Sequence, residues 1–298
     1  MSEDDARGHV IDSPFPVGLT AILMGRNEER YLPLSLPPLQ QLADEIVFVD
    51  TGSEDRTVAL AEAHGCRVLH CLWDDDFSAP KNLAITQAGY RWILNVDCDE
   101  VLVVEEGLRE RILALCGTSA APAWIVRIDN LMADGSSTPS QAMRLFRNDP
   151  RIRFVNPVHE GIADTVFRAW PDQPPEKIDL RLIHHGYSAG LNKEKIRRNV
   201  AILHKWVARD PHTIYGRYKL GMNLRFLGQE RAGAEYLEQA LRLADQDPDR
   251  SSLTFLVELV NTCYRIFQES GAVEQVEQLK RMVGTWNATA RQQGSRPP

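Results

Sequence analysis

The first third of the chain alternates apolar runs of strand length with segments whose apolar residues recur at helical spacing. The helical segments include "EDRTVALAEAHG" and "SAPKNLAITQAG". The strand-like runs are "VGLTAILM" (17–24), "EIVFVD" (45–50), "CRVLHCL" (66–72) and "YRWILNVD" (90–97). This alternation predicts a parallel sheet with helices on both faces. Such sheets bind ligands beyond the carboxyl ends of their strands, so the polar residues that follow these runs are candidates for a site.

The pattern changes twice further along the chain. Between about residues 122 and 187, short runs such as "AWIVRIDN" and "LRLIHHGY" are separated by Pro, Gly, Asn and Asp, which predicts a mixed or antiparallel extension of the sheet. From residue 192 onward the pattern is helical. We therefore expect a loose N-terminal arm (1–15), an α/β domain (16–190) and an all-α domain (191–298).

One segment of the helical part has the small and apolar spacing of a tetratricopeptide-type repeat. Its residues are Leu220, Gly221, Leu224, Gly228, Leu237 and Ala240. In such repeats, small residues let two antiparallel helices pack closely. Two interpretations stay open at this point, a repeat that holds a peptide in a groove and a helical bundle that caps the first domain.

The charge balance argues against nucleic acid as a partner. The 298 residues carry a net charge of -7 with a pI near 5.7, which provides no basic surface for binding phosphates. The first residues are polar and acidic, and no uncharged apolar run approaches the ~18 residues of a membrane span. We expect a cytoplasmic protein without a transmembrane segment, whose scattered cysteines are reduced.

The fourth strand-like run ends in an acidic loop. Asp97 and Asp99 stand one residue apart where the strand is expected to end. Two carboxylates at this spacing can converge on one hard cation that takes oxygen ligands. The alternative is an acid-rich helix start, since acidic residues favour a helix N-terminus, and Glu100 fits that description.

The second run is followed by a similar polar segment. Asp50 closes the run and is expected to project toward the same edge, where it would accept a hydrogen bond from a nucleobase or ribose. Ser53 is predicted to cap the next helix, with Glu54 and Asp55 in its first turn. These acids occupy the positive end of that helix, and the sequence has no G-x-G-x-x-G or Walker loop. A dinucleotide-binding fold is therefore not expected.

A cation is expected among these acids. Ser78 is predicted to cap the third helix, with Pro80 in its first turn. Lys81 then lies just inside the same end of the helix, at the edge where the acids gather. The alternative is that Lys81 is an ordinary solvated lysine.

Histidines cluster in the second half of the α/β domain. His159 precedes Glu160, and His184 precedes His185. Adjacent side chains on an extended segment point to opposite faces, so at most one of His184 and His185 is expected to reach a metal at the acidic loop.

Four motifs in this order resemble family 2 glycosyltransferases, which have the GT-A fold. They are "ILMGRNEERYLPLSLPPL", "DEIVFVDTGSEDRTVALAEAHGCRV", "WDDDFSAPKNLAI" and "RWILNVDCDEVL". The segments "RLFR", "VHEGI" and "IHHGY" and the helical tail are similar to a bacterial branch that contains sublancin-type peptide S-glycosyltransferases. The resemblance covers residues 17 to 190 well and the tail loosely. It implies a GT-A α/β domain with a Rossmann-like mixed sheet, followed by an all-α, tetratricopeptide-like domain.

The resemblance also implies a donor, a metal and an activity. The chain would be an inverting hexosyltransferase that takes a sugar from a nucleoside-diphosphate sugar, a UDP-sugar first among them. Asp97 and Asp99 would hold Mn2+ or Mg2+ against the diphosphate, with His184 or His185 as a further ligand. Here the family's "H-x-G-Y" segment reads "HHGY", so both histidines are kept, with His184 first.

Other residues receive roles in the same way. Asn27, Glu28 and Asp50 would contact the base and ribose, and Lys81 would approach the diphosphate. Glu160 matches the acidic position from which the family draws its general base, with Asp129 and Asp134 as alternatives. The acceptor is expected to be a peptide, a glycan or a small molecule, and the helical domain would hold a peptide or glycan acceptor.

Two other functions compete with this interpretation. Phosphatases of the haloacid dehalogenase type also place Asp-x-Asp after an apolar strand, as Asp97 and Asp99 are placed here. In them the motif follows the first strand of the domain, whereas here three strand-helix units precede it. The second alternative is a helical-repeat scaffold without catalysis.

Overall fold

The computed structural model describes residues 13–186 and 193–292, and it divides the chain into two compact units. The first unit contains the residues up to Asn156 and those from Glu160 to the end of the first described range. The second contains the residues from Lys193 onward together with the short segment Pro157–His159. Most of the expected N-terminal arm, residues 1–12, lies outside the described residues.

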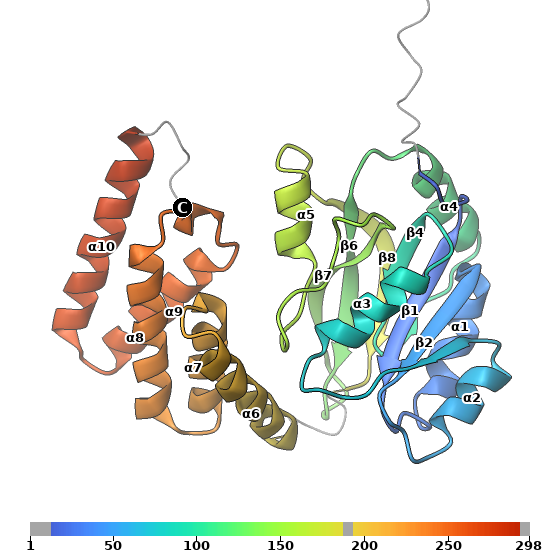
Figure 1. Cartoon of the computed structure of the whole chain (residues 1–298), viewed down its shortest axis with the longest axis horizontal. Helices are drawn as coiled ribbons and strands as arrows, with labels where there is room; N and C mark the ends of the chain where they lie inside the picture. The colour runs from blue at the N-terminus through green and yellow to red at the C-terminus, as the bar shows by residue number, and fades with distance from the viewer. Residues whose placement is uncertain (1–12, 187–192, 293–298) are drawn as a thin grey trace, which may run out of the picture. The chain divides into compact units, whose positions relative to one another are not determined.

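The first unit is an α/β structure (Figure 1). Its strands are β1 (Leu19–Gly25), β2 (Glu45–Asp50), β3 (Arg67–His70), β4 (Trp92–Asn95), β5 (Glu100–Leu102), β6 (Ala123–Leu131), β7 (Ser137–Arg147) and β8 (Glu176–His184). Its helices are α1 (Leu32–Leu42), α2 (Thr57–Ala63), α3 (Ser78–Gln87), α4 (Leu108–Thr118) and α5 (Ala163–Ala169).

The strands form one mixed sheet. Their order is β3-β2-β1-β4-β7-β6-β8-β5, and β1 to β4 are parallel to one another. β7 is antiparallel to β4 and to β6, and β5 is antiparallel to β8. The predicted parallel sheet with a mixed extension is confirmed. The carboxyl ends of β1, β2 and β4 meet at one edge, which carries the candidate residues.

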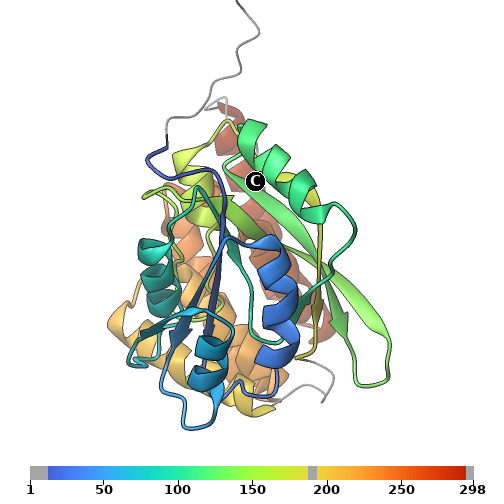
Figure 2. The same ribbon diagram turned by 90° about the vertical axis from the view of Figure 1, so that its right-hand side faces the viewer.

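Helices cover both faces of this sheet because residues along the parallel strands alternate between two apolar cores. Leu19, Ala21 and Leu23 of β1 pack with α1 and α4, whereas Ile22 packs on the opposite face with α3. Figures 1 and 2 show α3 on one side of the strands and α1 on the other. Burial on both faces explains why these strands read as continuous apolar runs in the sequence.

The link between β4 and β5 forces the sheet to curl. Three strands separate β4 from β5 in the sheet order, which in a flat sheet is about 19 Å at the usual strand spacing. Five residue steps join Asn95 to Glu100, and fully extended they reach about 18 Å. The link is not extended, since the Glu100 amide donates to the Asp97 carbonyl at 2.9 Å. The strands β7, β6 and β8 must therefore bend around this link, which contains Asp97 and Asp99.

The second unit is helical, as predicted. It contains α6 (Lys193–Arg209), α7 (Ile214–Phe226), α8 (Glu230–Gln246), the short 3-10 helix η1 (Arg250–Ser252), α9 (Leu256–Glu269) and α10 (Val273–Gln292). α7 and α8 form the expected hairpin around Gly221 and Gly233. A Cβ on Gly221 would lie 2.8 Å from the Gly233 carbonyl oxygen, so the two helices touch through their backbones. Within the described ranges, none of the helices has the length and apolar character needed to cross a bilayer.

Two glycines of the helical unit should respond oppositely to substitution. Gly221→Ala is expected to destabilise the unit by about 1–3 kcal/mol, because the new Cβ would also meet Leu237 Cγ at 2.7 Å. Gly284→Ala is the matched control in α10. Its Cβ would have no neighbour within 4 Å among the described residues, and alanine should stabilise the helix by up to ~1 kcal/mol. Urea unfolding followed by circular dichroism measures both, and equal effects of the two substitutions would contradict the close packing.

Candidate active site

Lys81 joins two of the candidate carboxylates. It lies in the first turn of α3, which packs on β1 and β2, and its ammonium is 5.2 Å from the centre of the Phe154 ring. Its Nζ donates to Glu160 Oε1 at 2.7 Å and contacts Asp97 Oδ1 at 3.3 Å. Only 6% of its side chain is exposed, so the solvated alternative for Lys81 is wrong.

Arg144 of β7 holds the other oxygen of Asp97. A single guanidinium nitrogen, Nη2, donates to Asp97 Oδ2 and to Glu100 Oε1, both at 2.8 Å. The second oxygen of Glu100, Oε2, accepts from the Asp97 backbone amide at 2.9 Å. Two cations and three carboxylates therefore form one network, the charged cluster, made of Lys81, Asp97, Glu100, Arg144 and Glu160.

The charges in this cluster stabilise one another. Burial alone would raise the pKa of Asp97, but Arg144 and Lys81 hold it far below its usual value. Burial alone would lower the pKa of Lys81, yet Asp97 and Glu160 raise it, so the lysine stays protonated. Burial raises the pKa of Glu100 to about 7, although Arg144 opposes that shift. Asp97 itself keeps 40% of its side chain exposed.

Asp99 pairs with a histidine beside this cluster. His184 Nε2 lies 3.4 Å from Asp99 Oδ2, and on the other side of the ring Nδ1 lies 2.9 Å from Asn130 Oδ1. An amide oxygen only accepts, so Nδ1 carries the hydrogen and Nε2 faces Asp99. Burial lowers the pKa of His184, but the Asp99 carboxylate raises it above its ordinary value.

This pair fits a divalent cation. Asp99 and His184 present an oxygen and a nitrogen atom, donor types that divalent cations bind, and Gly186 lies beside both without a Cβ. A Cβ on Gly186 would come within 2.6 Å of Asp99 Oδ2 and 2.4 Å of His184 Nε2. Among the residues that the structure describes, no three His, Cys, Asp or Glu side chains converge as a complete metal site. A cation here would therefore need further ligands from substrate or water, as Mg2+ and related ions commonly do.

The structure separates the two adjacent histidines. His184 ends β8, where its Cα pairs with that of Glu100, and its ring faces Asp99. His185 contacts the same loop through its backbone amide, which donates to the Asp99 carbonyl at 2.8 Å. The tyrosine that completes "HHGY" lies outside the described residues.

Asn27 and Glu28 connect the loop after β1 to the loop after β2 through hydrogen bonds. Asn27 has a left-handed backbone with φ of +60°, its amide donates to Ser53 Oγ, and its Oδ1 accepts from the Glu54 amide at 2.8 Å. The Glu28 amide donates to Thr57 Oγ1 at 2.6 Å. The two loops are thus joined by several cross-loop hydrogen bonds.

Asp50 organises the loop that follows β2. Its carboxylate accepts from the backbone amides of Gly52 and Ser53 at 3.1 Å, and His70 Nδ1 lies 3.4 Å away. Burial opposes ionisation, but these hydrogen bonds lower the pKa of Asp50 below its usual value. Asp50 therefore fixes the conformation of the loop at the edge where the sequence predicts nucleotide binding. Its side chain is 6% exposed.

The two predicted helix caps are wrong. α2 begins at Thr57, and Asp55 Oδ1 accepts from the Thr57 amide at 2.9 Å, while Ser53 bonds to Asn27 instead. At α3 the amide of Ser78 donates to Asp76 Oδ1 at 2.7 Å. In both turns a neighbouring aspartate replaces the serine, because its carboxylate is the stronger acceptor for the free amides.

The alternative base candidates lie in other surroundings. Asp129 of β6 is buried and pairs with Arg127 at 2.9 Å and with Arg181. Asp134 lies in the turn between β6 and β7, where it accepts from Ser136 at 2.6 Å and 2.9 Å. Glu160 alone of the three belongs to the charged cluster.

Sequence reasoning missed two members of the cluster. In the sequence Glu100 fits an acidic helix start, but it lies in the three-residue strand β5 and is buried against Arg144. Arg144 is not among the predicted site residues. The available signal was the "RLFR" segment, in which two arginines flank two apolar residues of an expected strand, since a buried arginine needs acceptors such as a carboxylate.

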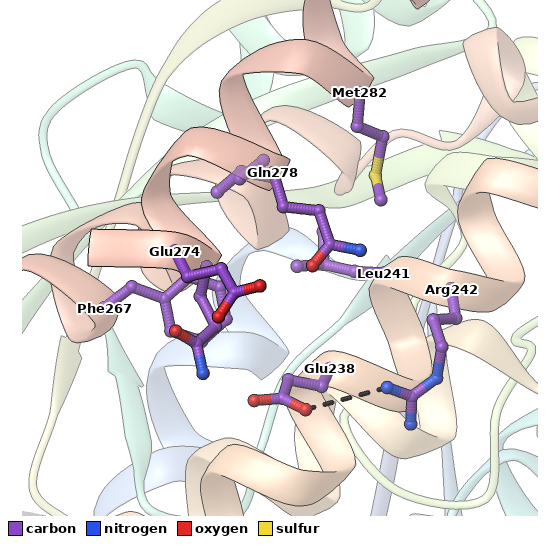
Figure 3. Close-up of a pocket in the computed structure, with 9 residues that line it drawn as sticks. Glu238, Leu241, Arg242, Phe267, Glu274, Gln278 and Met282 are labelled. Atoms are coloured by element: carbon purple, nitrogen blue, oxygen red, sulfur yellow. Dashed lines mark ion pairs between the residues drawn. The ribbon is translucent and has the colours of Figure 1, made fainter. Parts of the chain in front are cut away.

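The helical unit has a pocket of its own (Figure 3). It has a volume of about 280 Å3 and lies between α8, α9 and α10. Leu241, Phe267 and Leu279 supply apolar surface, and Glu238 and Arg242 form an ion pair at 3.6 Å beside it.

Comparisons with known proteins agree with this architecture. Residues 21–154 match the family model "Glycosyl transferase family 2". A TPR repeat-containing protein of Synechococcus elongatus is 34% identical over 75% of this chain and 56% of its own length. The glycosyltransferase SunS of Bacillus subtilis is 22% identical over 86% of this chain and 60% of its own length. The chain thus spans somewhat more than half the length of these two relatives.

A solved structure shares the fold. TarS of S. aureus, determined in complex with UDP-GlcNAc, aligns with a TM-score of 0.52 and 13% identity, covering 93% of this chain and 92% of that one. The family match, the relatives and the mixed sheet with its acidic edge all point the same way. The chain therefore carries a family 2 glycosyltransferase domain with the GT-A fold.

Proposed function

We propose that the protein is a metal-dependent, inverting glycosyltransferase that moves a sugar from a UDP-sugar to an acceptor. The observation that carries the proposal is the Asp99–His184 pair beside the charged cluster, at the edge where β1, β2 and β4 end. The TarS complex contains UDP-GlcNAc, and we propose the same class of donor here. Asn27, Glu28 and Asp50 would form the edge that receives the base and ribose.

The donor side of the reaction requires positive charge. When the glycosyl-phosphate bond breaks, negative charge grows on the departing nucleoside diphosphate, and a bound Mn2+ or Mg2+ would supply Lewis-acid stabilisation there. Asp99 and His184 would hold that ion. Asp97 keeps its oxygens on Lys81 and Arg144, so its proposed part is to fix these two cations beside the ion.

The acceptor side requires a base. The acceptor hydroxyl or thiol must lose a proton as it attacks the anomeric carbon, and we assign this role to Glu160. Its Oε1 accepts a hydrogen bond from Lys81 Nζ at 2.7 Å, which fixes the position of the carboxyl group. For the acceptor we propose a peptide or glycan held on the helical unit, where the pocket of Figure 3 offers apolar surface and a charged rim.

The phosphatase alternative loses its basis in this fold. Asp97 follows the fourth strand of a GT-A sheet and is held by two cations, whereas the phosphatase nucleophile stands on the first strand. The scaffold alternative makes a different prediction from the transferase, because a scaffold has no reason to bind a nucleotide.

Thermal denaturation tests the proposed function. UDP with Mn2+ at about 100 times its dissociation constant should stabilise the protein by about 2.7 kcal/mol, a rise in Tm of roughly 5–10 °C. UDP without metal and uridine with metal should each give a much smaller rise, since neither brings both the diphosphate and the ion. Equal shifts with and without Mn2+ would remove the metal from the proposal, and no shift in any condition would contradict the transferase itself.

A further inference from the structure

One guanidinium nitrogen closes a ring around the acidic loop. Arg144 Nη2 bonds to both Asp97 Oδ2 and Glu100 Oε1, and Glu100 Oε2 accepts from the Asp97 amide. The ring therefore ties the backbone of residue 97 to its own side chain through two other residues. Asp99 is not part of this ring and lies in the chain between Asp97 and Glu100, the two loop residues that the ring joins.

The ring is also fixed to the strand that carries the histidine. Glu100 begins β5, and its Cα pairs directly with that of His184 on β8. On the other side, Leu145, the neighbour of Arg144, pairs with Leu94 of β4. The curl of the sheet thus brings β4, β5, β7 and β8 around one loop, and Arg144 of β7 bonds to Asp97 after β4 and to Glu100 of β5.

The arginine is well suited to hold a fixed geometry. Only 14% of its side chain is exposed, against 3% for that of Glu100. Its Nε is buried and has no hydrogen-bond partner among the described residues. The two bonds of Nη2 anchor the guanidinium to the loop. Movement of Arg144 would release Asp97 and Glu100 together.

We propose that Arg144 is a positioning residue, which holds the Asp97–Glu100 loop so that Asp99 faces His184 and Asp97 faces Lys81. The proposal rests on the proposed function, because the pair that it positions is the proposed metal site. Arg144 acts through the loop and does not itself touch the ion. Partners that orient metal ligands in this way usually affect metal affinity 10- to 100-fold.

A simpler role for Arg144 would be to neutralise the buried Glu100 for the sake of folding. The two roles differ in what happens when both charges are removed. Replacing a buried ion pair by neutral residues is often tolerated, whereas removing one partner is strongly destabilising. Arg144→Met should therefore lower Tm, and the double variant Arg144→Met with Glu100→Gln should recover it, since glutamine still accepts from the Asp97 amide.

Measuring Mn2+ affinity in the presence of UDP separates the positioning role from the folding role. Electron paramagnetic resonance of the free ion gives this affinity. We expect at least 10-fold weaker Mn2+ binding in both the single and the double variant. Arg144→Lys should regain part of the affinity, since one charged nitrogen makes both contacts. If the double variant recovers Tm and wild-type affinity together, Arg144 serves only folding and the proposal is overturned.

A matched control lies three residues away on the same strand. Arg147 is buried too, but it donates to the carbonyls of Ala121 and Ser119 and stacks over Trp92. Arg147→Gln should lower Tm and leave the Mn2+ affinity unchanged. Arg144→Gln should lower Tm by a similar amount and should also weaken Mn2+ binding. Equal loss in both variants would overturn the positioning role. Failure of the wild-type protein to bind Mn2+ with UDP would instead overturn the proposed function.

Discussion

Glu160→Gln is expected to slow sugar transfer by about 10²–10⁴-fold, the usual contribution of a positioned general base. Glutamine has nearly the shape of glutamate and its amide oxygen still accepts from Lys81, but it cannot take a proton from the acceptor. Binding of UDP with Mn2+ should change little, because Asp99 and His184 are untouched. The measurement is the rate of UDP release from a UDP-sugar in the presence of acceptor, together with UDP affinity by calorimetry.

Asp134→Asn is the matched control for this prediction. Asp134 is the exposed alternative candidate, and asparagine retains an oxygen for the turn with Ser136. Its transfer rate should stay at the wild-type level. Asp129→Asn should lower Tm, because it leaves Arg127 and Arg181 without a carboxylate partner. If Glu160→Gln transfers sugar at the wild-type rate, the general base must be another residue.

Asp99→Asn is expected to weaken Mn2+-dependent UDP binding by more than about 100-fold. Loss of a residue that merely supports a ligand costs 10- to 100-fold, and Asp99 is proposed as a ligand itself. The Tm of the protein without ligands should change little, since Asp99 lies outside the ring formed by Arg144, Asp97 and Glu100. Calorimetric titration of UDP with and without Mn2+ measures the effect.

The control for Asp99 is an acid of the same edge. Asp74 is exposed in the loop before α3, and Asp74→Asn removes one negative charge without touching the pair. Its Mn2+-dependent affinity should be that of the wild type. If both variants lose affinity equally, the ion responds to the general negative charge of this edge, and the assignment of Asp99 as a ligand fails.

Much of the architecture was predictable because it depends on local pattern. The runs that became β1, β2 and β4 are apolar on both faces, and the polar residues after them had to meet at one edge of a parallel sheet. That reasoning anticipated that Lys81 and Asp97 would lie close together. The helical hairpin was equally legible, since Gly221 and its neighbours mark a close approach of two helices.

Contacts that depend on distant pairing were not predictable. Arg144 meets Asp97 only because β7 runs antiparallel beside β4, across 47 residues of sequence. β5 has three residues, too few to show a period, so Glu100 was open to interpretation as a helix start. Alternation allowed only one of His184 and His185 to face Asp99, and the pairing of Glu100 with His184 decided which.

The hydrogen bonds between the loops after β1 and β2 have a consequence for ligand recognition. Asn27 and Glu28 reach across to Ser53, Glu54 and Thr57, so both loops are ordered before any ligand arrives. A nucleoside that binds to them loses its own translational and rotational freedom, but the two loops lose little conformational freedom. Association at this edge should therefore carry a small conformational-entropy penalty, and discrimination between bases should come from fixed shape.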